Sequence, residues 1–308
     1  MKVSVLISSK NRSQFLTTLL GSFSKLKCDH FDWELIIVDN GSTDDTMQVL
    51  KMERDKYRFP LTVMQEPRPG KSRSLNLALT EAKGDLVVFT DDDIAPAESW
   101  LEAYVKAAEE RPNCAGFIGK ILPIWDSDIP EWLYKDGEYT VPRGIIGLCD
   151  FGEKERQLEG VLPSGVNVAI RREWIESLGK FREDLGPGTA LPYAEDTEYL
   201  RRLVERGYGY FYVPRALVYH FNPVERITKS YVLHWIYNAA RCQVIAYQAL
   251  KAVPTINGIP RYLLRQFIQR LISWLAHIGR ESGFHRKMRM INTLGEIAGY
   301  QTLKRLNR

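Results

Sequence analysis

The sequence predicts an α/β fold with a doubly wound, mostly parallel sheet flanked by helices and a helical extension at the C-terminus. Two observations support this prediction. Residues 2–90 alternate short apolar runs with helical patterns, and from residue 228 onward the pattern is helical alone. A chain of 308 residues, 44% of them hydrophobic, is also long enough to bury a large core.

The first 90 residues contain four apolar runs that are rich in β-branched residues and typical of buried strands. We expect strands at 2–8, 33–38, 61–65 and 86–90, separated by helices at 14–26, about 43–50 and 72–82. Right-handed crossovers place the loops after parallel strands along one edge of the sheet. Asp39, the loop 68–73 and the acids at 91–93 should therefore converge there.

Beyond residue 93 the elements are less regular. Pro96 should begin a helix that covers 98–109, and the long stretch 123–160 has few regular elements, which suggests a functional loop region. Further elements are expected as strands at 114–122, 161–170, 208–213 and 216–220 and as helices at 172–178 and 193–206. We expect a domain at 1–222, with halves at about 1–122 and 123–222, and a helical extension at 223–308.

The C-terminal segment is strongly basic. From Gly258 to Arg308 it has ten Arg or Lys residues and two acids, although the whole chain has a net charge of only +4. Its apolar residues lie on one helical face: Leu263, Leu264, Phe267, Ile268, Leu271, Ile272, Leu275 and Ile278. This pattern suits core packing or a dimer seam, and equally a helix that lies in a membrane interface.

Three consecutive acids, Asp91, Asp92 and Asp93, follow the strand at 86–90. Adjacent carboxylates repel one another unless a cation sits among them, so Asp91 and Asp93 are candidate ligands for Mn²⁺ or Mg²⁺. A solvated acidic turn is the alternative. His220, at the end of a strand, is either a further metal ligand or a half-buried histidine with its hydrogen bonds satisfied.

Other polar residues suit the binding of a nucleotide and the transfer of a group. Asp39 could accept hydrogen bonds from a base or ribose, or form an Asx turn. Lys71 and Arg73 lie where an anionic phosphate would bind. The pair Glu195 and Asp196 could supply a general base, or could simply be an acidic helix start. Aromatic residues could form a sugar platform or pack in the core: Trp125, Trp132, Tyr134 and Tyr139.

Taken in order, these segments resemble the family 2 glycosyltransferases, which are inverting enzymes with the GT-A fold. The likeness covers about 1–222. Residues 5–12 resemble the family's opening strand and Asn-Arg turn, 37–44 its nucleotide-binding turn, and 70–76 its Gly-x-x-x-Ala-x-Asn segment, with Ser74 in place of Ala. Asp91 to Asp93 match the DxD motif. The resemblance implies that the donor nucleotide contacts Ser8, Asn11, Arg12, Asp39, Lys71, Arg73, Asn76, Asp91 and Asp92.

The same resemblance assigns the remaining roles. Asp93, with Asp91 and His220, would hold the metal. Gly165 and Asn167 match the acceptor-side segment, and with Glu195 and Trp125 they would contact the acceptor or the donor sugar. Asp196 of the Glu-Asp motif would be the catalytic base. The implied reaction moves a sugar, with inversion, from a nucleotide-sugar, with UDP-sugar the first choice, to a saccharide or lipid-linked acceptor.

Two other functions are compatible with some of these residues. A nucleotidyltransferase should carry a Gly- and Arg-rich signature near its first strand, and a non-catalytic nucleotide- or sugar-binding module should lack the metal-binding acids and the base. No nucleic-acid partner is expected. Because the N-terminus goes directly into a strand and no run of 18 apolar residues occurs, we expect a cytoplasmic protein, held peripherally at the inner face of the membrane by its basic tail.

Overall fold

The computed structural model describes residues 1–57, 59–133, 141–247, 253–280 and 282–306. These residues form two compact units. The first contains 1–124, 147–189 and 195–221, and the second contains 125–146, 190–194 and 222–308. The last segment of the second unit begins at Asn222, and two inner segments of the chain also belong to that unit.

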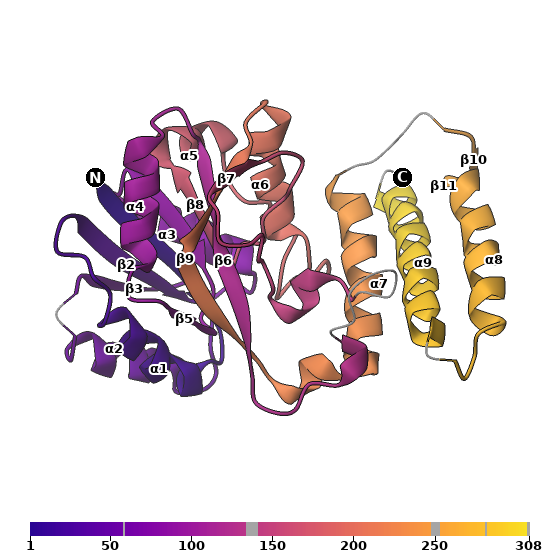
Figure 1. The fold of residues 1–308 in the computed structure, drawn as a ribbon, viewed down its shortest axis with the longest axis horizontal. Coiled ribbons are helices and arrows are strands. Elements are labelled where there is room, and N and C mark those ends of the chain that lie inside the picture. Colours follow the sequence, from indigo (N-terminus) through magenta and orange to yellow (C-terminus); the bar gives the residue numbers. More distant parts are fainter. Residues whose placement is uncertain (58, 134–140, 248–252, 281, 307–308) are drawn as a thin grey trace. The chain divides into compact units, whose positions relative to one another are not determined.

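One large sheet forms the centre of the first unit (Figure 1). Its strand order is β3-β2-β1-β4-β8-β6-β9-β5, and β7 pairs with β9. The parallel strands are β1 (Lys2–Ser9), β2 (Asp32–Asp39), β3 (Leu61–Gln65) and β4 (Leu86–Thr90). Antiparallel pairs join β4 to β8 (Asn167–Arg171), β8 to β6 (Gly116–Trp125), and β9 (Tyr210–Asn222) to both β5 (Ile94–Pro96) and β7 (Arg156–Leu158). The predicted fold class is confirmed. The parallel pairs are those among the first four strands, β1 to β4.

Helices cover both faces of this sheet, as the side-chain alternation of a buried strand requires. In β4, Leu86 and Val88 join one apolar cluster, whereas Val87 and Phe89 join the other. The first cluster includes side chains of α1 (Ser13–Phe23), α2 (Thr46–Arg54) and α4 (Trp100–Glu110). The second includes side chains of α3 (Lys71–Glu81), α5 (Arg172–Leu178) and α6 (Glu195–Glu205).

Three predicted elements were wrong in detail. Pro96 does not begin a helix, because it ends the edge strand β5, where a missing N–H is tolerated, and α4 begins at Trp100. The two strands expected at 208–213 and 216–220 are one strand, β9, in which Pro214 lies between the stretch paired with β7 and the stretch paired with β5. The strand expected at 161–170 begins only at Asn167.

The second unit is mainly helical, as predicted for the C-terminal extension. It contains α7 (Lys229–Ala246), α8 (Arg261–Leu275) and α9 (Ser282–Leu306), with α9 between the other two (Figure 1). A Cβ atom on Gly295 would lie 2.3 Å from the Tyr237 carbonyl oxygen, so α9 and α7 approach closely because this residue is glycine. The smaller elements are η1 (Glu131–Leu133), η2 (Arg143–Ile146), η3 (Val224–Ile227) and the hairpin of β10 (Thr255–Ile256) and β11 (Ile259–Pro260), which the sequence had not indicated.

None of the helices that the structure describes has the length and apolar character needed to cross a lipid bilayer.

Candidate active site

The carboxyl ends of β1 and β4 meet through direct polar contacts, as their parallel pairing predicts. The hydroxyl of Ser9, the last residue of β1, donates a hydrogen bond of 2.6 Å to Asp92. The guanidinium of Arg12 lies 3.5 Å from one oxygen of Asp92 and 3.6 Å from one of Asp93. The Asn-Arg turn and the acidic triplet therefore form one cluster.

Each acid of the triplet has a different environment. Asp91 accepts a 2.5 Å contact from the Lys71 ammonium. Burial and the adjacent Asp93 carboxylate raise the pKa of Asp92 to about 7, against the opposing effects of Arg12 and Ser9. Asp93 lies 3.3 Å from Nε2 of His220. Among the residues that the structure describes, the Lys71 ammonium and the Arg12 guanidinium thus lie beside the three acids.

Asp91, Asp93 and His220 can each direct one ligand atom to a common point, since these atoms lie within 4.8 Å of one another. His220 reaches the acids because β9 pairs with β5 so that it lies opposite Ile94. Gly147 makes room for the imidazole, since a Cβ atom there would be 2.7 Å from its Nδ1. Two carboxylates and an imidazole are a donor set that suits Mn²⁺, and the carboxylates alone suit Mg²⁺.

The nucleotide-binding turn predicted at 37–44 is closed by its own hydrogen bonds. Asp39 is fully buried and accepts a bond of 3.2 Å from the N–H of Ser42, three residues further along the chain, so its carboxylate helps to close the turn. The side-chain carbonyl of Asn11 accepts 2.8 Å from the Thr43 N–H. Ser8, one residue before the end of β1, is half-buried.

Asn40 was missed by the sequence analysis. Its amide donates to the carbonyls of Glu66 and Arg68, at 3.1 and 2.8 Å, and its oxygen accepts 2.8 Å from the N–H of Gly70. It therefore ties the turn after β2 to the segment that leads into α3. The only signal in the sequence was its place directly after Asp39.

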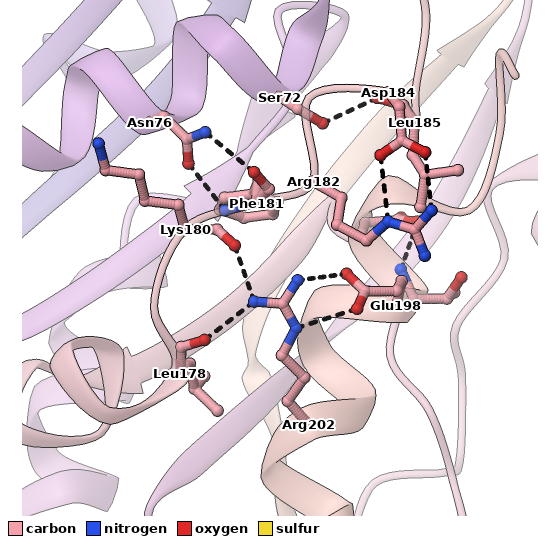
Figure 2. Close-up of polar contacts among 12 residues, drawn as sticks. Ser72, Asn76, Leu178, Lys180, Phe181, Arg182, Asp184, Leu185, Glu198 and Arg202 are labelled. Atoms are coloured by element: carbon pink, nitrogen blue, oxygen red, sulfur yellow. Dashed lines mark hydrogen bonds and ion pairs between the residues drawn. The ribbon is translucent and has the colours of Figure 1, made fainter. Parts of the chain in front are cut away.

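The first turns of α3 hold the loop that precedes α6 (Figure 2). The amide of Asn76 donates 3.0 Å to the Phe181 carbonyl, and its oxygen accepts 2.8 Å from the Phe181 N–H. The hydroxyl of Ser72 donates 2.9 Å to the Leu185 carbonyl, and the Lys71 N–H donates 3.0 Å to the Pro187 carbonyl. Asn76, predicted to contact the donor, thus has its main contacts with this loop instead.

Helix α6 holds the same loop from the other side (Figure 2). Arg202 donates to the carbonyls of Leu178 and Lys180 at 2.9 and 2.7 Å while its guanidinium pairs with Glu198. Arg73, predicted near a phosphate, lies 3.3 Å from Glu183 of the loop. The loop is thereby fixed where it passes Glu195, and a Cβ atom on Gly186 would be 2.9 Å from Cγ of that acid.

The carboxylate of Asp196 is oriented by two backbone groups. One oxygen accepts 2.7 Å from the Gly165 N–H, and the other accepts 2.7 Å from the Thr197 N–H. A side chain on Gly165 would collide with Asp196, since a Cβ atom there would be 2.9 Å from the Asp196 Cβ. Each oxygen keeps lone pairs beyond these bonds, which a base requires.

Lys71 connects the acidic triplet to the Glu-Asp pair. Its ammonium is 3.9 Å from Glu195, and it lines a small cavity together with Thr90, Gly165 and Asp196. Burial and the Asp196 carboxylate raise the pKa of Glu195 to about 8, with Lys71 acting against them. Burial alone would lower the pKa of Lys71, but Asp91, Glu195 and Asp196 outweigh it, so the pKa is raised.

Asn167, predicted on the acceptor side, is instead a buried structural residue. Its oxygen accepts bonds from the Trp100 indole and the Tyr104 hydroxyl, at 2.8 and 2.7 Å. Its amide donates to the carbonyls of Lys120 and Ala216, at 2.9 and 2.8 Å. Because both ends of a fully buried amide are occupied, it has no group left for an acceptor.

The predicted aromatic platform falls outside the first unit. Trp125 and Trp132 belong to the second unit, where the Trp132 ring packs edge-on against Phe284 with centroids 5.0 Å apart. Packing is therefore the observed role of Trp132. Tyr134 and Tyr139 lie outside the described residues.

Known proteins are similar to this chain in sequence or in fold. The model of the family described as Glycosyl transferase family 2 matches residues 4–179, so the chain belongs to this family. The match covers the acidic triplet and Gly165 but ends before Asp196 and His220.

Among curated relatives, poly(ribitol-phosphate) beta-N-acetylglucosaminyltransferase TarS of Staphylococcus aureus is 32% identical over 137 residues. That region is 44% of this chain and 24% of TarS, so the chain spans about a quarter of the length of this relative.

Two solved structures share the fold. One is the mannosyltransferase PcManGT of Pyrobaculum calidifontis, in complex with GDP-Man and Mn²⁺. Its TM-score is 0.57 at 19% identity, over 99% of this chain and 75% of that one. The other is residues 1–349 of S. aureus TarS in complex with UDP, with a TM-score of 0.52 at 18% identity over 98% and 92% of the two chains. These likenesses support the GT-A assignment of the fold.

Proposed function

We propose that this protein transfers a sugar, with inversion, from a nucleotide-sugar donor to a hydroxyl group of an acceptor. The observation that carries the proposal is the position of Lys71, which contacts Asp91 of the acidic triplet and lines a cavity with Asp196. Lys71 therefore lies between the candidate base and the candidate site for the diphosphate and metal. Membership of the glycosyl transferase family supports the same reading.

In the proposed reaction Asp196 takes the proton of the acceptor hydroxyl. The hydroxyl oxygen forms a bond to the anomeric carbon, and the bond from that carbon to the diphosphate oxygen breaks on the opposite face. The backbone N–H groups of Gly165 and Thr197 hold the Asp196 carboxylate in one orientation. A positioned base of this kind typically contributes about 10²–10⁴-fold to the rate.

The leaving diphosphate needs positive charge. Asp91, Asp93 and His220 would hold Mn²⁺ or Mg²⁺, which supplies Lewis-acid stabilisation of the departing diphosphate when it is bound. Among the described residues, Lys71 lies against Asp91 and Arg12 lies against Asp93. They would contribute to holding the anionic donor.

For the donor we propose a UDP-sugar, and for the acceptor a saccharide or a lipid-linked saccharide. The UDP complex of TarS and the polymer acceptor in the name of that relative support this choice. Because PcManGT was solved with GDP-Man, GDP-sugars are also tested as donors. A lipid-linked acceptor would be met at a membrane surface, where we propose that the basic C-terminal helices make peripheral contact.

The deciding experiment measures release of nucleoside diphosphate from UDP-, GDP- and dTDP-sugars, with Mn²⁺, Mg²⁺ or EDTA. We expect metal-dependent release from one donor, lost in Asp93→Ala. With an acceptor saccharide present, Asp196→Asn should lose transfer by about 10²-fold or more while the Kd for the nucleoside diphosphate changes little.

Two outcomes would contradict the proposal. Flat thermal shifts with all three free nucleotides, together with no release, would mean that the acidic site does not bind nucleotides. An Asp196→Asn variant that weakens nucleotide binding as much as it slows transfer would remove Asp196 from the role of base.

A further inference from the structure

Helix α8 turns polar side chains toward α9. The guanidinium of Arg270 donates 2.5 Å to the Thr293 hydroxyl and 2.9 Å to the Arg289 carbonyl. Ser273 accepts 2.7 Å from Arg286. These contacts fix which side of α8 faces its neighbour within the second unit.

Part of the apolar surface of α8 is turned outward, although Leu263 is buried and Phe267 is half-buried. Ile268, Ile272 and Leu275 follow one another at helical spacing and are 57%, 62% and 52% exposed, and Ile278 just beyond the helix is 61% exposed. An amphipathic helix of a globular protein normally buries this face. Single exposed apolar residues are ordinary, but a continuous exposed stripe marks an interaction surface.

The charge around this stripe is positive. Helix α8 contains Arg261, Arg265 and Arg270 and has no acidic residue. Arg261 and Arg265 are exposed and precede Ile268 by seven and three residues, so they lie on the same side of the helix as the stripe. Arg280, beyond Ile278, is exposed as well.

We infer that the outward face of α8, made of Ile268, Ile272, Leu275 and Ile278 with Arg261 and Arg265, docks on an anionic lipid surface. Its apolar side chains would enter the boundary between headgroups and acyl chains, and its arginines would contact the headgroup phosphates. A second copy of the chain fits less well, because two such faces would bring like charges together. This inference names the surface that makes the membrane contact in the proposed function. It rests on the proposed function only for the reason why the protein would bind lipid.

The experiment is co-sedimentation of the full chain with vesicles of phosphatidylcholine alone and of phosphatidylcholine with phosphatidylglycerol. We expect binding to the anionic vesicles, weakened by high salt because the charges at the surface are screened. The double variant Ile268→Glu, Ile272→Glu should bind at least about tenfold more weakly, since it removes buried apolar area and adds repelling charge. Arg261→Glu, Arg265→Glu should lose the dependence on phosphatidylglycerol.

The matched control is Met52→Glu, an apolar side chain of α2 that is 66% exposed and lies outside the face. It should bind vesicles like the wild type. Equal binding by wild type and the double Ile variant, or no binding by wild type, would overturn the inference. A wild-type dimer in sedimentation velocity that becomes monomeric in the double Ile variant would overturn it in favour of a second copy.

Release of nucleoside diphosphate from a soluble donor distinguishes a failure of the docking inference from a failure of the proposed function. The α8 variants should release it at the wild-type rate, because none of the changed residues belongs to the candidate active site. Lipid binding without any release would leave the docking surface standing and the enzyme assignment rejected.

Discussion

Lys71 holds a position that a metal ion would also favour. Its ammonium touches Asp91, and Asp91 is one of the three candidate metal ligands. The sequence indicated Lys71 only as a partner for phosphate. The structure adds that the Lys71 ammonium neutralises the acid to which a cation would bind.

Lys71→Met should therefore strengthen binding of Mn²⁺ alone and weaken binding of the nucleoside diphosphate. We expect each of the two dissociation constants to change by about tenfold. This corresponds to a fraction of the several kcal/mol with which two unit charges about 4 Å apart interact at an effective dielectric constant near 20. Titration of Mn²⁺ by electron paramagnetic resonance and calorimetry with nucleotide measure the two. Lys106→Met is the control, because Lys106 is an exposed lysine of α4 that pairs with Glu110 of the same helix. Weaker Mn²⁺ binding by Lys71→Met would show that Lys71 supports the metal site instead of competing for it.

Glu195 gives the protein a specific pH dependence. Its pKa is raised from 4.5 to about 8, so the folded protein holds a proton that the unfolded chain releases above about pH 4.5. Stability from this group is present below the unfolded pKa and is lost as pH rises toward 8. Glu195→Gln should remove that loss, so the variant should gain Tm over wild type at pH 8 and gain little at pH 4.5.

The Glu195 prediction is checked by thermal unfolding in EDTA across pH 4.5 to 8.5. Glu205→Gln, at the exposed end of the same helix, serves as the control and should follow wild type throughout. A constant difference between Glu195→Gln and wild type at all pH values would mean that Glu195 does not change its protonation on folding.

At the level of elements, the loop from Phe181 to Thr189 depends on α3 and α6 for its position. Asn76 pairs with both backbone groups of Phe181 and is 8% exposed. Asn76→Ala would leave a buried N–H and a buried C=O without their partner. We expect a loss of about 2–6 kcal/mol in the free energy of unfolding, from about 1–3 kcal/mol for each of the two unsatisfied groups.

Urea denaturation measures the effect of Asn76→Ala. Asn113→Ala removes an exposed amide and should change the unfolding free energy by less than about 0.5 kcal/mol. An Asn76→Ala variant as stable as the control would mean that water replaces the lost amide. If Asn76→Ala loses stability but transfers sugar at the wild-type rate, Asn76 anchors the loop and does not contribute to the active site.

The elements also show what the sequence could predict. The apolar runs predicted the four parallel strands closely because a strand buried on both faces leaves an unambiguous pattern. The turns after β2, β3 and β4 were predicted to converge. The bond from the Gly70 N–H to Asn40 and the contact of Lys71 with Asp91 bear this out. Asn167 and Asn76 could not be distinguished from ligand-binding residues, because whether an amide is satisfied depends on long-range backbone partners such as Ala216 and Phe181.

For the whole molecule, the sequence divided the chain at residue 222 because the family resemblance ends there, shortly before the helical pattern begins at Thr228. It could not show that 125–146 and 190–194 pack with the helices, since these segments carry no periodic pattern. The ring of Trp235 lies 5.8 Å from that of Tyr193, and the Asn222 amide donates 3.1 Å to the Ile146 carbonyl. The second unit is thus assembled from three separate parts of the chain.

A fragment that ends at residue 222 should therefore be poorly folded in its middle. It would retain the segment 125–146 but lose Lys229 and Phe284, which pack on Trp132. Buried side chains of that segment, among them Leu133, Ile145 and Ile146, would be left without the helices of their own unit. We expect the fragment to bind the dye ANS and to elute as aggregates, whereas the full chain does neither.

Phe284→Ala in the full chain tests the same packing without a truncation. It should lower the free energy of unfolding by about 2 kcal/mol, roughly half the effect of removing a fully buried Phe, because Phe284 is only half-buried. Leu306→Ala, at a side chain 66% exposed, should have little effect and is the control. If the 1–222 fragment is monodisperse, silent toward ANS and as stable as the full chain, the inner segments do not need the helices. The boundary predicted from the sequence would then describe an independent domain.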